Sequence, residues 1–145
     1  MVGVAHAVRG SHHRRVRRSS DGSRSADAAF RAEGTEATAA ATRAHRLNPL
    51  SLDARFTQAL VAPDDTTALR YYEAATELQP ENWQTWYRLG VFQLDLREPP
   101  DACAAYVALN QAYTLDPHGN RWVPGGPLDR ARDAVNDPEH PACGR

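Results

Sequence analysis

The stretch that decides the fold reads Tyr72-Glu73-Ala74-Ala75-Thr76-Glu77-Leu78-Gln79-Pro80. Two further segments, Ala41–Pro49 and Leu109–Pro117, align with it without gaps. Each copy has an apolar or small residue, then Ala three positions later, Leu three after that, a polar residue and Pro. The prolines lie 31 and 37 residues apart, an average of 34. A repeat of this length indicates an array of helix pairs.

The spacing within each copy predicts a helix with one apolar face, because residues three apart lie on the same side of an α-helix. The central Ala lets a neighbouring helix approach closely. The Pro ends the helix, since it restricts the backbone of the residue before it and its ring clashes with the preceding turn. Each pair buries its apolar face only by stacking on another pair. The sequence therefore predicts an all-α fold.

Apolar periodicity and helix start and stop signals predict helices at residues 27–47, 51–61, 66–78, 82–96 and 101–115, with a last short helix from Pro127. Ser51 and Asn82 are suited to cap two of them. We expect four parts, namely a tail at residues 1–26, a helical repeat array at 27–117, a connector with a capping helix at 118–136, and a C-terminal tail at 137–145.

The tail at residues 1–26 is rich in Gly, Ser, His and Arg, and we predict that it is disordered. Residues 1–32 carry a charge of +5 and residues 33–145 a charge of −6, which gives the net charge of −1. The favoured interpretation is a solvated tail without a binding role, and the alternative is contact with nucleic acid or another anionic surface through the four arginines at positions 14, 15, 17 and 18. No aromatic residue lies between them to stack on bases, so nucleic-acid binding is the less favoured interpretation.

The segment Trp86-Tyr87-Arg88-Leu89-Gly90, followed by Ala105, Leu109, Ala112 and Pro117, resembles a tetratricopeptide repeat. The preceding unit matches in its second half, at Ala68, Tyr72, Ala75 and Pro80, whereas Leu52, Arg55 and Phe56 replace the Trp, Leu and Gly of its first half. The resemblance covers about two and a half repeats. It implies a short tetratricopeptide-type helical-hairpin array with a C-terminal capping helix.

Packing between the helices is assigned to the positions of the repeat pattern. These are Ala41, Ala44, Leu47, Ala68, Tyr72, Ala75, Leu78, Trp86, Leu89, Gly90, Ala105, Leu109, Ala112 and Leu115.

In this family the first helix of each pair lines a concave surface that binds peptides. The resemblance therefore implies a peptide groove lined by Asp53, Thr57, Leu60, Gln84, Tyr87, Val91 and Leu94. Tyr87 and Val91 stand where the carboxylate-clamping variant of the family has polar groups, so a mostly apolar groove for a helix or an extended segment is expected. The alternative is that Tyr87 and Val91 pack against neighbouring helices.

A narrower resemblance is to the C-terminal repeat tail of actinobacterial O-antigen ligase-like membrane proteins. It rests on the segments Leu47–Leu50, Leu78–Asn82, Trp86–Gly90, Cys103–Tyr106, Leu115–Pro117 and Trp122–Asp129, and on abundant Ala and Arg without Lys. Those proteins carry their chemistry in a multi-span membrane domain, which nothing in this sequence matches. The resemblance implies a detached tail or fragment of such a cell-envelope polysaccharide protein, without ligase activity.

No pattern in the sequence favours an enzyme, a cofactor or a catalytic residue. The six histidines are scattered over separate elements. A zinc site formed by Cys103, His118, His140 and Cys143 is a minor alternative, because these residues lie on unrelated loops. The two cysteines either form a disulfide, which implies an oxidising compartment, or remain free thiols in the cytosol. No apolar run is long enough for a membrane helix, although association with a membrane protein stays open.

The sequence thus predicts a non-catalytic helical-repeat scaffold for protein–protein interaction, with a protein or peptide partner of unknown identity. The first alternative is the detached tail of an O-antigen ligase-like protein, and the second is a nucleic-acid-associated adaptor that uses the Arg-rich tail. The compartment is left open between the cytoplasm and the cell envelope.

Overall fold

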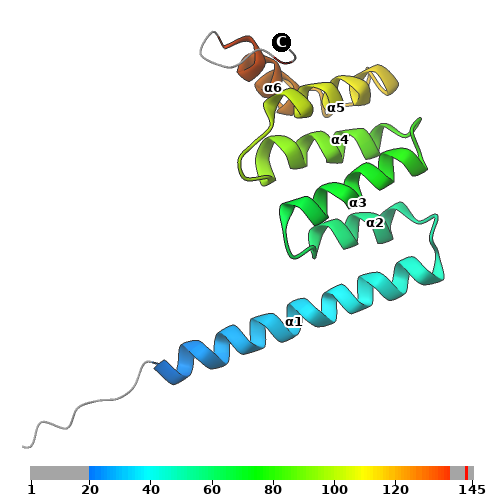
Figure 1. The fold of residues 1–145 in the computed structure, drawn as a ribbon. Helices are drawn as coiled ribbons and strands as arrows, with labels where there is room; N and C mark the ends of the chain where they lie inside the picture. The colour runs from blue at the N-terminus through cyan, green and yellow to red at the C-terminus, as the bar shows by residue number, and fades with distance from the viewer. Residues whose placement is uncertain (1–19, 138–142, 144–145) are drawn as a thin grey trace, which may run out of the picture. The chain divides into compact units, whose positions relative to one another are not determined.

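The computed structural model describes the backbone of residues 20–137 and Cys143, and the side chains of residues 31–137 and Cys143. The helices are α1 (Ser20–Leu47), α2 (Leu52–Leu60), α3 (Asp65–Leu78), α4 (Trp83–Val91), α5 (Ala102–Leu115) and α6 (Pro127–Asn136), with a π-helical segment η1 (Phe92–Leu96) after α4 (Figure 1). No strand occurs in this part of the chain. The prediction of an all-α fold is confirmed.

The prediction of a disordered tail over residues 1–26 is wrong for its last part, because α1 already begins at Ser20. Residues 20–32 contain four alanines and no proline, so the local sequence permits a helix there. The rest of the predicted tail, residues 1–19, lies outside the described residues. The chain divides into residues 1–33 and a compact unit of residues 34–145.

Four helix starts are fixed by side chains that accept a hydrogen bond from a backbone N–H of the first turn. The capping residues are Ser51 for α2, Asp64 for α3, Asn82 for α4 and Asp101 for α5. Such caps satisfy N–H groups that have no partner inside the helix. The helix bounds therefore agree closely with those expected from the start and stop signals.

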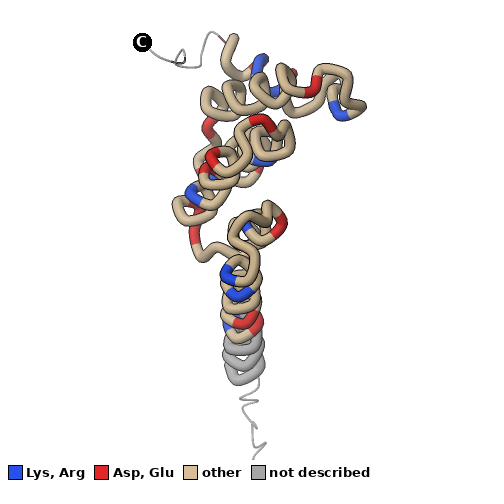
Figure 2. Tube along the Cα trace, turned by 90° about the vertical axis from the view of Figure 1, so that its right-hand side faces the viewer, with Lys and Arg blue, Asp and Glu red and all other residues tan. Residues whose placement is uncertain are grey.

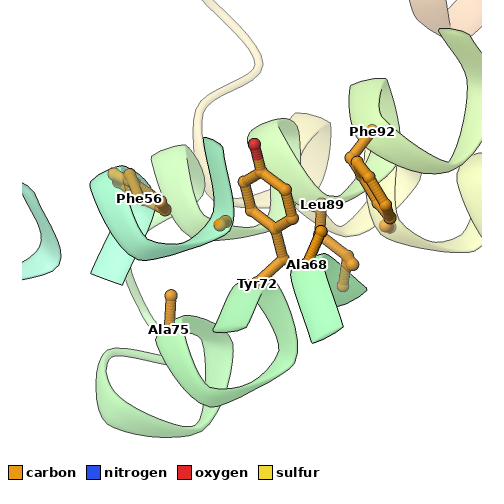
Figure 3. Close-up of a cluster of buried hydrophobic side chains, with 8 residues drawn as sticks. Phe56, Ala68, Tyr72, Ala75, Leu89 and Phe92 are labelled. Atoms are coloured by element: carbon orange, nitrogen blue, oxygen red, sulfur yellow. The ribbon is translucent and has the colours of Figure 1, made fainter. Parts of the chain in front are cut away.

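From α2 to α6, consecutive helices pack against each other along the unit. The hairpin of α2 and α3 and the hairpin of α4 and α5 meet where α3 contacts α4, and α6 packs on α5 (Figure 1). A central cluster of buried side chains joins the two hairpins, with Phe56, Tyr72, Leu89 and Phe92 as its largest members (Figure 3). The Tyr72 ring lies between the other two rings, 6.2 Å from Phe56 and 5.0 Å from Phe92.

A C-terminal cluster holds α6 against the second hairpin. Its buried members are Ala105, Leu109, Leu128 and Ala131, and the partly buried Tyr87, Val91, Leu94, Tyr106 and Trp122 pack around them. The Trp122 indole N–H donates to the backbone oxygen of Asp116, 2.6 Å away, which fixes the connector that leads to α6. The Cys103–Cys143 disulfide joins the start of α5 to the end of the chain, with 5.4 Å between the Cα atoms.

Most residues assigned to packing are at least half-buried. Ala41, Ala68, Tyr72, Ala75, Leu89, Gly90, Ala105, Leu109 and Ala112 are buried, and Leu78, Trp86 and Leu115 are half-buried. The packing prediction is wrong for Ala44 and Leu47, which are exposed. Leu47 is 87% exposed because no described helix covers that side of α1. A repeat pattern gives a helix an apolar face, but burial of that face needs a neighbouring helix.

Gly90 allows α4 and α5 to approach closely. A Cβ atom at this position would lie 2.5 Å from Leu109 Cγ and 3.1 Å from the backbone oxygen of Ala105. Leu109 is fully buried and has little room to move aside. The glycine is therefore required by packing.

Candidate functional site

A hollow of about 340 Å³ lies between α2 and α4. Its lining residues come from four elements and are Leu60, Tyr72, Trp83, Gln84, Tyr87, Arg88, Val91 and Leu96. An adjoining hollow of about 220 Å³ shares Leu60, Tyr72 and Leu96 and is otherwise lined by Ala59, Ala62, Pro63, Asp64, Asp65, Ala68 and Phe92. We call the two together the α2–α4 groove.

One face of α4 forms the longer wall of the groove. Gln84, Tyr87, Arg88 and Val91 follow one another at intervals of three, one and three residues, so their side chains lie on the same side of the helix. The Asn82 side chain fixes the start of this helix by accepting a hydrogen bond from the Gln84 N–H, with 3.0 Å between nitrogen and oxygen. The wall is therefore set by the regular geometry of a capped helix.

Trp83 is held in the wall by one contact with an aromatic ring and one with a cation. Its ring centroid lies 6.2 Å from that of Tyr87, at an interplanar angle of 70°. The guanidinium carbon of Arg121 lies 3.2 Å from the Trp83 ring centroid, and Arg121 forms an ion pair with Asp116. A cation over an indole face is attracted by the negative charge density of the ring. Trp83 thus offers a preformed aromatic surface to the groove.

The π turn of η1 decides which residue closes the far end of the groove. The Arg97 N–H donates to the oxygen of Phe92, five positions earlier, with 2.9 Å between the two atoms. A π turn takes one more residue than an α turn. Leu96 therefore reaches the groove, whereas Asp95 turns to α6 and accepts two hydrogen bonds from Arg130, at 2.7 and 2.9 Å. The prediction of an uninterrupted helix over 82–96 misses this segment.

Tyr72 forms the floor of the groove and Arg88 lies beside it. Tyr72 is only 4% exposed, and burial raises the pKa of its phenol, an effect that the charge of Arg88 partly opposes. The guanidinium carbon of Arg88 lies 4.5 Å from the Phe56 ring centroid, which holds this cation at the groove while its side chain stays exposed. The Tyr72 phenol at the floor therefore remains neutral at ordinary pH. Arg88, the one cation among the described residues that line the groove, is held in place by its contact with the Phe56 ring.

The structure brings together four of the seven residues predicted for the groove, namely Leu60, Gln84, Tyr87 and Val91. Asp53 and Thr57 are exposed on α2 and do not line the hollow, because they lie nearer the N-terminus of that helix. Leu94 is also wrong as a groove residue, because it packs against the C-terminal cluster together with Tyr87 and Val91 and does not line the hollow. Tyr87 and Val91 line the hollow and also pack against that cluster, so the expected packing is confirmed, whereas peptide binding stays a prediction.

In the larger hollow, four lining residues were missed by the sequence prediction, namely Tyr72, Trp83, Arg88 and Leu96. Trp83 could have been found from its spacing of four to Tyr87, which places both rings on one helix face. Tyr72 was assigned to the core alone, although its ring also forms the floor of the hollow. Leu96 had no signal, because the π turn is not visible in the periodicity.

The cysteines are joined to each other, which excludes the zinc site proposed from Cys103 and Cys143 in this structure. His140, a third ligand of that alternative, lies outside the described residues. Within residues 31–137 and Cys143, no group of three or more His, Cys, Asp or Glu side chains is placed to hold a metal ion. None of the described helices is long and apolar enough to span a membrane.

Comparison with known proteins gives no match, either with a family model, with a curated protein or with a solved structure.

Proposed function

We propose that the chain is a non-catalytic scaffold of the tetratricopeptide type, which binds a short apolar segment of a partner protein in the α2–α4 groove. The observation that carries the proposal is a pair of large aliphatic side chains that line one hollow from different elements. Leu60 is 67% exposed and Leu96 is 57% exposed, and both border Tyr72. Full burial of a Leu side chain contributes about 1.5–3 kcal/mol. A partner that covers both therefore gains a large part of its binding energy at this point.

The details of the second hairpin support the tetratricopeptide interpretation. The Trp86 indole N–H donates to the backbone oxygen of Pro80, 2.7 Å away, and so ties the hairpin to the helix end before it. Gly90 stands at the closest approach of α4 and α5. Trp86 and Gly90, the two most specific residues of the repeat motif, therefore each have a structural role in this hairpin.

A second candidate function is favoured by the Cys103–Cys143 disulfide. Disulfides persist in oxidising compartments and are rare in the cytosol. The bridge agrees with the hypothesis that the chain is a detached tail of an O-antigen ligase-like cell-envelope protein, in which the same groove would bind a membrane-protein partner. Alkylation of thiols before reduction, followed by mass spectrometry of the native protein, tests this candidate, because two free thiols in a cytosolic fraction would remove it.

The nucleic-acid adaptor remains a prediction only. Its four arginines, at positions 14, 15, 17 and 18, lie outside the described residues.

Selection from a library of displayed peptides tests the proposed function. The purified chain is the bait, and the selected peptides are measured by fluorescence anisotropy against Leu60→Glu, Leu96→Glu and Val107→Glu. Val107 is the matched control, since it is 64% exposed but lies on α5 outside the groove. We expect peptides with a recurring apolar pattern that lose at least about tenfold in affinity with the two groove variants and keep it with the control. Equal binding to all three variants, or no enrichment, would refute the proposal.

A further inference from the structure

The two hollows of the α2–α4 groove carry opposite charges. Arg88 is the charged residue of the larger hollow, whereas Asp64 and Asp65 are those of the adjoining one. Figure 2 marks the acidic and basic residues along the backbone. Residues 31–137 hold ten Arg against fifteen Asp and Glu, so this part of the chain is acidic as a whole. A segment that fills the groove therefore meets a cation in the larger hollow and two carboxylates in the adjoining one.

The carboxylates of the adjoining hollow are held by neutral donors. Asp64 accepts hydrogen bonds from the backbone N–H and the hydroxyl of Thr67, at 2.8 and 3.1 Å. Asp65 accepts one from the Glu98 N–H at 2.8 Å. Among residues 31–137, none of the ion pairs involves either aspartate. The backbone N–H of Thr67 lowers the pKa of Asp64, so its negative charge is present at neutral pH.

The groove has the length of about two turns of a helix. The lining residues of α4 run from Gln84 to Val91, which corresponds to about 10 Å along the helix axis. Apolar side chains at i, i+4 and i+7 of a second helix cover the same length. Helices commonly carry acidic residues in their first turn and basic residues in their last, where these charges complement the helix dipole. Such a helix matches the groove when it runs in the same direction as α4.

We propose that the partner segment is a basic amphipathic helix, whose apolar face covers Leu60 and Leu96 and whose C-terminal Arg or Lys residues lie over Asp64 and Asp65. The inference rests on the proposed function and names the chemistry of its partner. The acidic surroundings add a second effect, because they attract a basic segment and speed its association.

Two synthetic peptides test the proposal, measured by fluorescence anisotropy on the full chain. Both are amphipathic helices of about 14 residues with Leu at helical spacing, and one ends in two Arg where the other ends in two Glu. We expect the Arg peptide to bind roughly tenfold more tightly than the Glu peptide at low salt. Leu60→Glu should weaken both peptides.

The decisive variant is Asp64→Asn/Asp65→Asn, which removes both charges but keeps the hydrogen-bond acceptors. It should reduce the preference for the Arg peptide to less than about threefold. The matched control is Glu73→Gln/Glu77→Gln, which removes the same charge from the exposed side of the same helix and should keep the preference. A preference that survives in the Asn variant, or weakens equally in the control, would overturn the proposal.

Other outcomes separate the inference from the function beneath it. Equal binding of both peptides, lost in Leu60→Glu, would refute the basic partner and leave the groove as a docking site. Failure of both peptides would also refute the basic helix, while the library selection judges the groove independently. A several-fold gain in peptide affinity after replacing the arginines at positions 14, 15, 17 and 18 by Gln would show that the chain's own tail is the occupant, against the proposal.

Discussion

Gly90→Ala is expected to destabilise the protein, although alanine is the better helix former. The new Cβ would lie 2.5 Å from Cγ and 3.0 Å from Cδ2 of Leu109. Leu109 is fully buried, so the helices must move apart. Overpacking of this kind costs about 1–3 kcal/mol, and the gain in helix propensity returns about 1 kcal/mol. We expect the free energy of unfolding to fall by up to about 2 kcal/mol.

The same substitution should become stabilising when Leu109 is first replaced by Ala. Leu109→Ala alone costs about 2–5 kcal/mol, because it leaves a cavity in the C-terminal cluster. It also removes both side-chain atoms that a Cβ at position 90 would meet, so that only the Ala105 oxygen, at 3.1 Å, remains close. In this background Gly90→Ala should raise the free energy of unfolding by about 0.5–1 kcal/mol. The two substitutions are therefore coupled by about 2 kcal/mol.

Urea unfolding followed by far-ultraviolet circular dichroism, with the disulfide oxidised, measures all four proteins of the cycle. Gly34→Ala is the matched control, because a Cβ there meets no atom within 4 Å, and it should not lower the stability. An equal loss from Gly90→Ala in both backgrounds would refute the reasoning, since the cost would then not arise at Leu109.

The remaining predictions concern the disulfide, one helix cap and the groove. Reduction of Cys103–Cys143, 40 residues apart, should lower the free energy of unfolding by up to about 4 kcal/mol, and an unchanged urea midpoint with dithiothreitol would contradict this. The pKa of Asp64 is lowered in the folded protein by the Thr67 N–H, so its contribution is present at neutral pH and is lost as the pH falls below about 4. The acid-unfolding profile of Asp64→Ala should lack that contribution. Asp64→Asn should keep the helix cap but lose its pH dependence. Identical acid-unfolding profiles of the wild type and Asp64→Asn would contradict this prediction. Leu60→Glu and Leu96→Glu should each change stability by less than about 0.5 kcal/mol, because both side chains are exposed, and a larger loss in thermal unfolding would mean that they belong to the core.

The sequence was sufficient for those features that depend on local chemistry. Caps such as Ser51 and Asn82, and helix ends before Pro49, Pro80 and Pro117, can be recognised because each acts on its own backbone within a turn or two. These signals placed the bounds of α2, α3 and α5 almost to the residue, whereas α1 begins seven residues earlier than expected.

Features that depend on neighbouring helices could not be predicted in the same way. Leu47 has the same place in the repeat pattern as Leu78, yet it is exposed because it lacks a covering helix. The resemblance placed Leu94 in the groove, but Leu94 packs in the C-terminal cluster, and Leu96, at the end of the π turn, lines the groove instead. A one-residue change of helical geometry leaves no trace in the amino-acid pattern, although it exchanges the residues on every face beyond it.

The π turn also links the groove to the end of the chain. Leu96 lines the groove, and the residue before it, Asp95, forms an ion pair with Arg130 of α6. A ligand that holds Leu96 in place therefore restricts the π turn, which also positions Asp95 for its ion pair with α6. Trp83 provides a second link between the groove and the C-terminal part, because it contacts Arg121 of the connector that leads to α6. Because such coupling is reciprocal, occupancy of the groove should slow hydrogen exchange in α6, and release of α6 should weaken the ligand by the same free energy. The C-terminal helix would then serve as an effector of the groove and not only as its cap.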